Sequence, residues 1–310
     1  MPGQPMPGQP KEGEPMPGGE APPMPPAEQQ AQQNPARKRL EAAQQKMRDA
    51  QKKLEETKRS EAKEAQEEAR QELEKAKAEL EEILRQLREE EIERTLAQLE
   101  ARFRKMLEMQ LKVNETTQRL ASVPAETRGR EVDIESGKLA VEQRKIGLEA
   151  DKAYNLLLEE GSSIAFTESV EQLRSDMDQV SNWLAKTKLD PVTLGVEEDI
   201  VTALNEMIAA LQQAQKDQEK KKEDQQQQPM EQGEEQDQPL VDKIAELKMI
   251  KSMQLRVNDR TQRFSKLIAA PEDPTGQATD GELRQAVKQL GDRQSKLQRI
   301  TRDIVLGKNQ

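Results

Sequence analysis

The fold class is decided by a charged stretch with apolar residues at regular intervals, Leu73-Glu74-Lys75-Ala76-Lys77-Ala78-Glu79-Leu80-Glu81-Glu82-Ile83-Leu84-Arg85-Gln86-Leu87. Its apolar residues alternate spacings of three and four, which places them on one face of a helix, the seam of a coiled coil: Leu73, Ala76, Leu80, Ile83 and Leu87. The same spacing recurs on both sides, at Leu40, Ala43, Met47, Ala50 and Leu54, and at Leu96, Leu99, Phe103 and Met106. Residues 36–123 contain neither glycine nor proline. We therefore predict one long coiled-coil helix over residues 36–123.

Two parts of this helix depart from the regular seam. At residues 62–69 the apolar positions hold only alanine (Ala62, Ala65 and Ala69), so we expect this part to be thin, exposed and loosely paired. Between Leu87 and Leu96 an acidic run interrupts the heptad count, as a stutter does. We expect the helix to change its winding or its partner there.

The composition excludes a large globular core and most catalytic chemistry. Of the 310 residues 33% are hydrophobic, 2% aromatic and 35% charged, so narrow apolar seams are what the chain can bury. Cysteine and histidine are both absent, which excludes disulfides, thiolate nucleophiles, histidine bases and ordinary zinc sites. No phosphate-binding loop motif is present, and paired carboxylates on solvated helices are typical surface charge. We predict no catalytic residue, no cofactor, no metal site and no enzymatic activity.

Proline, glycine and charge divide the rest of the chain. Residues 1–35 repeat Met-Pro-Gly-Gln-Pro and are predicted to form a disordered Pro/Gly/Gln-rich tail. Residues 124–222 are predicted to form helical hairpins or a bundle, with helices over 131–160, before Pro191 and over 197–221. An acidic Gln-rich linker follows at 223–239, and a C-terminal helical hairpin at 240–310. The predicted fold class is all-α, a long coiled-coil helix followed by helical hairpins.

The apolar spacing also predicts which residues of the later helices face inward. They are Leu139, Ile146, Ala150, Ala153 and Leu157; Val170, Leu173, Met177, Val180 and Leu184; Ile200, Leu204, Ile208 and Leu211; and Leu283, Val287, Leu290, Leu297 and Ile304.

An internal repeat links the long helix to the C-terminal hairpin. Residues 109–120 recur at 253–264 with eight of twelve positions identical, and each copy is followed by a loop with proline and a second helix, so the hairpin at 240–310 repeats the unit at 103–157. Gln110 with Asn114, and Gln254 with Asn258, lie one turn apart, where amides can fix register across helices. The candidate interaction seam consists of Phe103, Met106, Val113, Thr117 and Leu120 with Leu247, Ile250, Val257, Thr261 and Phe264. A duplicated packing unit and a ligand cleft between hairpins both remain open.

The chain resembles a family of uncharacterised coiled-coil proteins of planctomycete-type bacteria over about residues 80–310. The stretches that carry the resemblance are residues 109–120, Leu157 to Gly161 with Ala165-Phe166, Gly195 to Ile208, and Ala245 onward to Val305. The resemblance implies no activity, since such proteins are labelled chromosome-segregation-like only for their coiled coils. Its relatives carry an N-terminal hydrophobic or export segment, whereas this chain opens on Pro-Gly repeats.

These observations favour a structural or interaction protein that associates with itself or with a protein partner through helices. A chromosome- or nucleic-acid-associated factor is the alternative, although a net charge of −10 argues against a nucleic acid partner. The sequence as written has no export signal and no apolar stretch of membrane-spanning length. We therefore expect a cytoplasmic protein, or an envelope-associated scaffold if the true start lies upstream.

Overall fold

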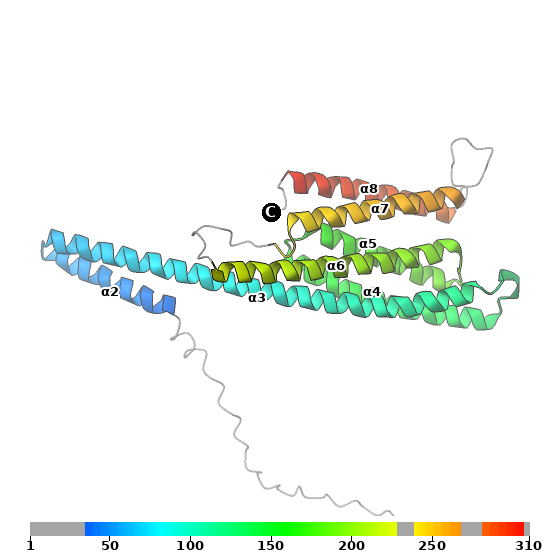
Figure 1. Ribbon diagram of the computed structural model, residues 1–310, viewed down its shortest axis with the longest axis horizontal. Coiled ribbons are helices and arrows are strands. Elements are labelled where there is room, and N and C mark those ends of the chain that lie inside the picture. Colours follow the sequence, from blue (N-terminus) through cyan, green and yellow to red (C-terminus); the bar gives the residue numbers. More distant parts are fainter. Residues whose placement is uncertain (1–34, 228–238, 268–280, 307–310) are drawn as a thin grey trace, which may run out of the picture. The chain divides into compact units, whose positions relative to one another are not determined.

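The structure is a computed structural model that describes residues 35–227, 239–267 and 281–306. Within these ranges the chain is helical throughout and has no strand, which confirms the predicted all-α class (Figure 1). It divides into two compact units at Leu84 and Arg85, which we name the N-terminal hairpin (described from residue 35 to 84) and the C-terminal bundle (residues 85–306). The predicted tail, apart from Pro35, lies outside the described residues.

The helices follow one another in the order α2 (Pro35–Glu55), α3 (Arg59–Ala121), the short 3₁₀ helix η1 (Ala125–Thr127), α4 (Arg130–Glu160), α5 (Ile164–Ala185), α6 (Pro191–Gln227), α7 (Lys243–Leu267) and α8 (Gly281–Val305). Helix α6 begins earlier than predicted because proline, which lacks an N–H, is well suited to the first turn of a helix. The prediction of a linker from residue 223 is wrong for residues 223–227, which belong to α6. The remainder of that linker, residues 228–238, lies outside the described residues.

The single helix predicted over residues 36–123 is interrupted by a tight turn at residues 56–58. Thr57 adopts a left-handed conformation with φ of 64°. The N–H of Lys58 donates to the carbonyl of Lys53 over 2.9 Å, and the N–H of Thr57 donates to that of Leu54 over 3.0 Å. These two bonds form a Schellman motif, which satisfies the last carbonyls of α2. Glycine normally occupies the position with this left-handed conformation. Because threonine stands there instead, the sequence contains no signal of a turn.

In the N-terminal hairpin, α2 packs antiparallel to the first part of α3 (Figure 1). Ion pairs Lys46–Glu68 and Lys53–Glu61 join the two helices in that direction. Its interior contains only alanine at the fully buried positions: Ala36, Ala43, Ala50, Ala62, Ala65, Ala69 and Ala76. The expectation of an exposed stretch at residues 62–69 is therefore wrong, because α2 returns along α3 and covers these alanines.

The C-terminal bundle contains the large apolar residues. Every residue predicted to face inward on α4, α5 and α6 is buried, which confirms those faces. On α8 Leu290, Leu297 and Ile304 are buried, whereas Val287 is exposed. The rings of Phe103 and Phe166 stack with centroids 6.1 Å apart. Helix α4 ends at Gly161, whose φ of 76° suits glycine at this cap.

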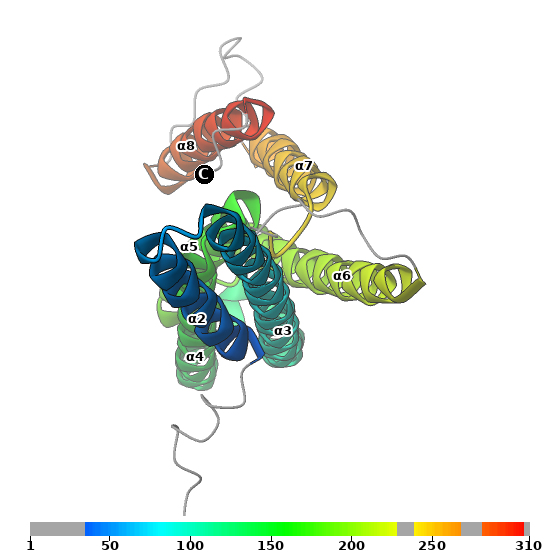
Figure 2. The ribbon, with the colours of Figure 1, turned by 90° about the vertical axis from the view of Figure 1, so that its left-hand side faces the viewer.

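Helices α7 and α8 lie side by side and against α5, as Figure 2 also shows. One buried carboxylate fixes this arrangement at the start of α5. Glu246 of α7 accepts hydrogen bonds from the Ser163 hydroxyl and from the backbone N–H of Ala165 at 3.2 Å. A carboxylate at this position satisfies free N–H groups of a helix N-terminus.

Candidate functional site

The repeat forms the same amide ladder in both of its hairpins. Gln110 of α3 exchanges two hydrogen bonds with Gln143 of α4, at 2.9 and 2.8 Å. In the second copy Gln254 of α7 exchanges two with Gln294 of α8, at 2.7 and 2.8 Å. Each glutamine also donates to an amide one turn along its own helix, Gln110 to Asn114 at 2.8 Å and Gln254 to Asn258 at 2.9 Å. The prediction that these amides fix the register of the two helices is consistent with this geometry.

The two amide ladders differ in their surroundings. Gln110 and Gln143 are fully buried, whereas the bonds between Gln254 and Gln294 are exposed to solvent. Because water can replace a lost hydrogen bond only in the exposed ladder, the buried ladder constrains its hairpin more strongly.

The candidate interaction seam forms the interior of the bundle. Eight of its ten residues are buried: Phe103, Met106, Val113, Thr117, Leu120, Ile250, Val257 and Phe264. Leu247 and Thr261 are exposed. These eight side chains pack within the chain and are not presented to a partner.

Thr117 joins the first copy to α6 through a buried carboxyl group. Its hydroxyl oxygen lies 2.9 Å from Oε1 of Glu197 and 2.9 Å from the carbonyl oxygen of Val113. The other carboxyl oxygen, Oε2, has no hydrogen-bond partner among the described residues. Burial raises the pKa of Glu197 to about 7, against the lowering effect of Thr117. A protonated Glu197 can donate to Thr117 and leave the threonine proton for the carbonyl of Val113, so that both hydroxyl protons have an acceptor.

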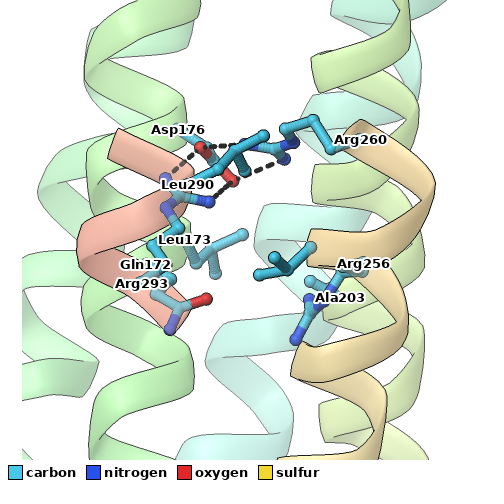
Figure 3. Close-up of a pocket in the computed structure, with 9 residues that line it drawn as sticks. Gln172, Leu173, Asp176, Ala203, Arg256, Arg260, Leu290 and Arg293 are labelled. Atoms are coloured by element: carbon cyan, nitrogen blue, oxygen red, sulfur yellow. Dashed lines mark hydrogen bonds and ion pairs between the residues drawn. The ribbon is translucent and has the colours of Figure 1, made fainter. Parts of the chain in front are cut away.

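The second copy is joined to α5 and α6 by a row of alternating charges whose centre, Asp176 and Arg260, is buried. Asp176 of α5 accepts from Arg260 of α7 at 2.8 and 2.9 Å and from Arg293 of α8 at 3.1 Å (Figure 3). Arg260 also donates through Nε to Asp199 of α6 at 2.8 Å, and Asp199 pairs in turn with Arg263. The order of charges is therefore Arg293, Asp176, Arg260, Asp199, Arg263. Four helices meet through these five side chains.

The charges of neighbouring side chains in this row stabilise one another. Burial opposes ionisation of Asp176, but the guanidinium groups of Arg260 and Arg293 outweigh it and hold its pKa well below the ordinary value. Burial likewise opposes the charge on Arg260, and Asp176 and Asp199 raise its pKa despite this. Buried ion pairs of this kind are costly to break, because the remaining partner is left charged in a medium of low dielectric.

The cavity at Asp176 in this network is too small for a substrate. It measures about 10 Å³, space for one water molecule, and Arg256, Arg260, Arg293 and Asp176 line it with apolar neighbours such as Leu290 (Figure 3). Because the donors and acceptors of the network are already paired with each other, it holds helices together and offers no free group for acid–base chemistry.

Two further kinds of site were sought in the described ranges. None of their acidic residues gather in a group of three or more that could hold a metal ion. No helix there is both long and apolar enough to cross a membrane.

The repeat itself contains the signal for the residues that sequence reasoning missed. The copies differ at four positions. At two of these the second copy has an arginine: Arg256 stands where the first copy has Lys112, and Arg260 where it has Thr116. Asp176 lies three residues after Leu173 and four before Val180, so helical spacing already placed it beside a buried face. A carboxylate on such a face requires a partner, and the added arginine of the second copy supplies it.

Comparisons with known proteins find no match: no family model fits the chain, and neither a curated protein nor a solved structure is similar to it. The resemblance to planctomycete-type coiled-coil proteins stays a prediction.

Proposed function

We propose that the chain is a non-enzymatic structural and interaction protein that works by helix-to-helix association, with the N-terminal hairpin as its docking module. The C-terminal bundle supports this reading because its buried glutamine ladder and its buried arginines are paired between its own helices. Its buried arginines pair with carboxylates and do not form a phosphate-binding surface. Binding is therefore better sought on an exposed apolar surface.

One observation carries the proposal: the hairpin buries its alanines and leaves its large apolar side chains in solvent. Each of five buried alanines is followed three positions later by a charged residue and four positions later by leucine or methionine. These large residues are Leu40, Met47 and Leu54 of α2 and Leu73 and Leu80 of α3, and their exposed fractions are 36–49%. We call them the apolar flank.

Helix geometry places all five on the same side of the hairpin. In two antiparallel helices, residues at the same offset from the contact line lie on the same side of the pair. The charged residues at the shorter offset therefore share the opposite side, where Arg39 pairs with Glu72 and Glu79 and Lys46 with Glu68. One side of the hairpin is closed by ion pairs, and the other carries the five exposed apolar side chains. Such a surface is typical of a protein interaction site.

The proposal is tested by a photo-crosslinking residue placed at Met47 of the full chain in its native cell. We expect cross-links to a helix of another chain, identified by mass spectrometry. The matched control carries the same residue at Val141 of α4, an apolar residue of the C-terminal bundle that is similarly exposed (50% against 47%). The proposal fails if position 47 gives no more inter-chain cross-linking than position 141.

A further inference from the structure

The apolar flank has a self-complementary pattern that identifies its partner. We propose that it binds the same flank of a second copy of this chain, so that two hairpins form an antiparallel four-helix bundle. This inference rests on the proposed function and specifies the occupant of that same surface. It follows from the thin interior of the hairpin, the area of the flank and the charges at its edge.

The interior of the hairpin is too thin to stand alone. Alanines are the only fully buried apolar residues between its helices, and alanine contributes little apolar area compared with leucine or methionine. Domains of about 40–70 residues rarely fold stably on so small a core, and oligomerisation is one of the ways in which they gain more. The alanines do allow α2 and α3 to approach closely. This turns the larger side chains toward a second layer, where large and small residues can interdigitate.

The dimensions of the flank match a small but specific dimer interface. Helix α2 has 21 residues, so it is about 30 Å long. Two helices with axes about 8–10 Å apart present a face about 20 Å wide. The face of each copy thus measures about 600 Å², and two copies bury about 1,200 Å², the lower bound for a stable specific interface. Ten large apolar side chains, five from each copy, would fill its centre.

The charges at the edge of the flank select the arrangement of the two copies. The position directly after a buried alanine points toward the second layer. On α3 this position is basic after three of the four buried alanines, at Lys63, Arg70 and Lys77, and is Gln66 after the fourth; on α2 it is Gln44 and Gln51 after the first turn. Stacking α3 on α3 of the second copy would bring these basic groups together, although Arg70 already pairs with Glu67 and Glu74, and Lys77 with Glu81, of their own helix. Stacking α2 on α3 instead opposes glutamine amides and basic groups, which can form hydrogen bonds.

The positions of these residues along the helix axes, their heights, agree with that arrangement. The pairs Lys46–Glu68 and Lys53–Glu61 set the level of α2 against α3, and by helix geometry they place Gln44 level with Arg70 and Gln51 level with Lys63. A two-fold axis parallel to the helices keeps these heights unchanged. It places Gln44 of one copy opposite Arg70 of the other, and Gln51 opposite Lys63.

Disulfide trapping tests the arrangement directly, because the chain contains no cysteine of its own. Full-length Gln44→Cys and Arg70→Cys chains are mixed and oxidised. Both positions are exposed, so neither change disturbs the interior. We expect a disulfide-linked heterodimer in at least tenfold excess over that from a control mixture of Lys46→Cys and Glu68→Cys, which lie on the charged side. Equal yields in the two mixtures, or a dominant Gln44→Cys homodimer, would overturn the arrangement.

Light scattering on the unmodified full chain tests dimerisation itself. We expect twice the mass of the chain at micromolar concentration, and a monomer when Leu40, Met47 and Leu73 are all changed to glutamine. The control changes Ile134, Val141 and Leu148, exposed residues of α4, to glutamine and should leave the dimer intact. An unmodified chain that is monomeric throughout overturns this inference. The proposed function survives that result if Met47 still cross-links to a different protein.

Discussion

The two copies of the repeat form the same kind of hairpin but attach it to the other helices of the bundle in different ways. The shared residues, such as Gln110 and Gln254, form the same ladder inside each hairpin. The attachments of the two hairpins to other helices differ: that of the first copy uses Thr117, which both copies share, whereas that of the second copy uses Arg260, which stands where the first copy has Thr116. The first copy contacts α6 through the neutral pair of Thr117 and Glu197, whereas the second contacts α5 and α6 through Arg260 and its two aspartates. Copying therefore preserved the hairpin, and a few substitutions gave it a new attachment.

The largest effect is expected from breaking the attachment of the second copy. Changing Asp176 to Asn leaves Arg260 and Arg293 buried side by side without their shared counter-charge. We expect a loss of about 3–5 kcal/mol in the free energy of unfolding, measured by urea denaturation at neutral pH, with faster hydrogen exchange in α7 and α8 than in α4.

The matched control for Asp176 is Asp151→Asn. Asp151 pairs with Arg174 between α4 and α5, but both side chains are partly exposed, so the expected loss is below about 1 kcal/mol. Because the pKa of Asp176 is depressed, its stabilisation is present at neutral pH and is lost only as the solution becomes strongly acidic. Equal losses for the two substitutions would contradict a special role for the buried network.

A substitution of Glu197, which attaches the first copy to α6, is expected to raise the free energy of unfolding, by less than the loss at Asp176. The folded chain holds the proton of Glu197 up to about pH 7, whereas the unfolded chain releases it near pH 4.5. The stability due to this proton is therefore fully present below pH 4.5 and is lost as the pH rises through 7. Changing Glu197 to Gln removes that loss, so we expect a gain of up to about 3 kcal/mol at pH 8 and little change at pH 4.

Urea denaturation of both proteins at several pH values measures this difference. The Glu197→Asp variant serves as the control, because it keeps an ionisable group and should keep a pH-dependent stability. A gain for Glu197→Gln that is the same at pH 4 and pH 8 would show that the carboxyl group is not protonated in the folded chain.

A third effect is expected inside the first hairpin. Changing Gln110 to Ala leaves the amide of Gln143 buried without its partner. We expect a loss of about 1–2 kcal/mol in the free energy of unfolding, measured by urea denaturation. The Gln110→Glu variant adds a buried charge and should lose more, which separates the cost of a missing hydrogen bond from that of a general disturbance.

The sequence predicted the faces of the bundle well because large apolar residues report burial directly. Ile146, Leu173 and Leu204, for example, fall at helical spacing and are all buried. The N-terminal hairpin was predicted less well for the same reason. Its leucines and alanines follow a single 3,4 pattern, and the pattern does not say that only the alanines face α2. A left-handed threonine, Thr57, then allowed the chain to reverse where no glycine marked a turn.

The polar attachments could be predicted only in part, because they depend on which helices meet. The repeat predicted that Gln110 and Gln254 bond across helices, but it did not identify Gln143 and Gln294 as their partners. Asp176 and Asp199 pair with arginines that lie more than 60 positions away in the sequence. The spacing of residues within one helix cannot identify such partners. A carboxylate on a buried face does predict that a partner exists.

The smallest effect is expected at the exposed ladder, and it sharpens the comparison between the copies. Changing Gln254 to Ala removes the same two amide bonds as Gln110→Ala, but water reaches the amide of Gln294 and replaces them. We expect a loss below about 0.5 kcal/mol, measured by the same denaturation. Thermal unfolding of Gln110→Ala and Gln254→Ala side by side provides the control, since the substituted residue type and the number of lost bonds are equal. If both substitutions lower the stability equally, the pairing of the two amides alone determines the contribution of a ladder. If only Gln110→Ala lowers it, the burial of the first ladder determines that contribution.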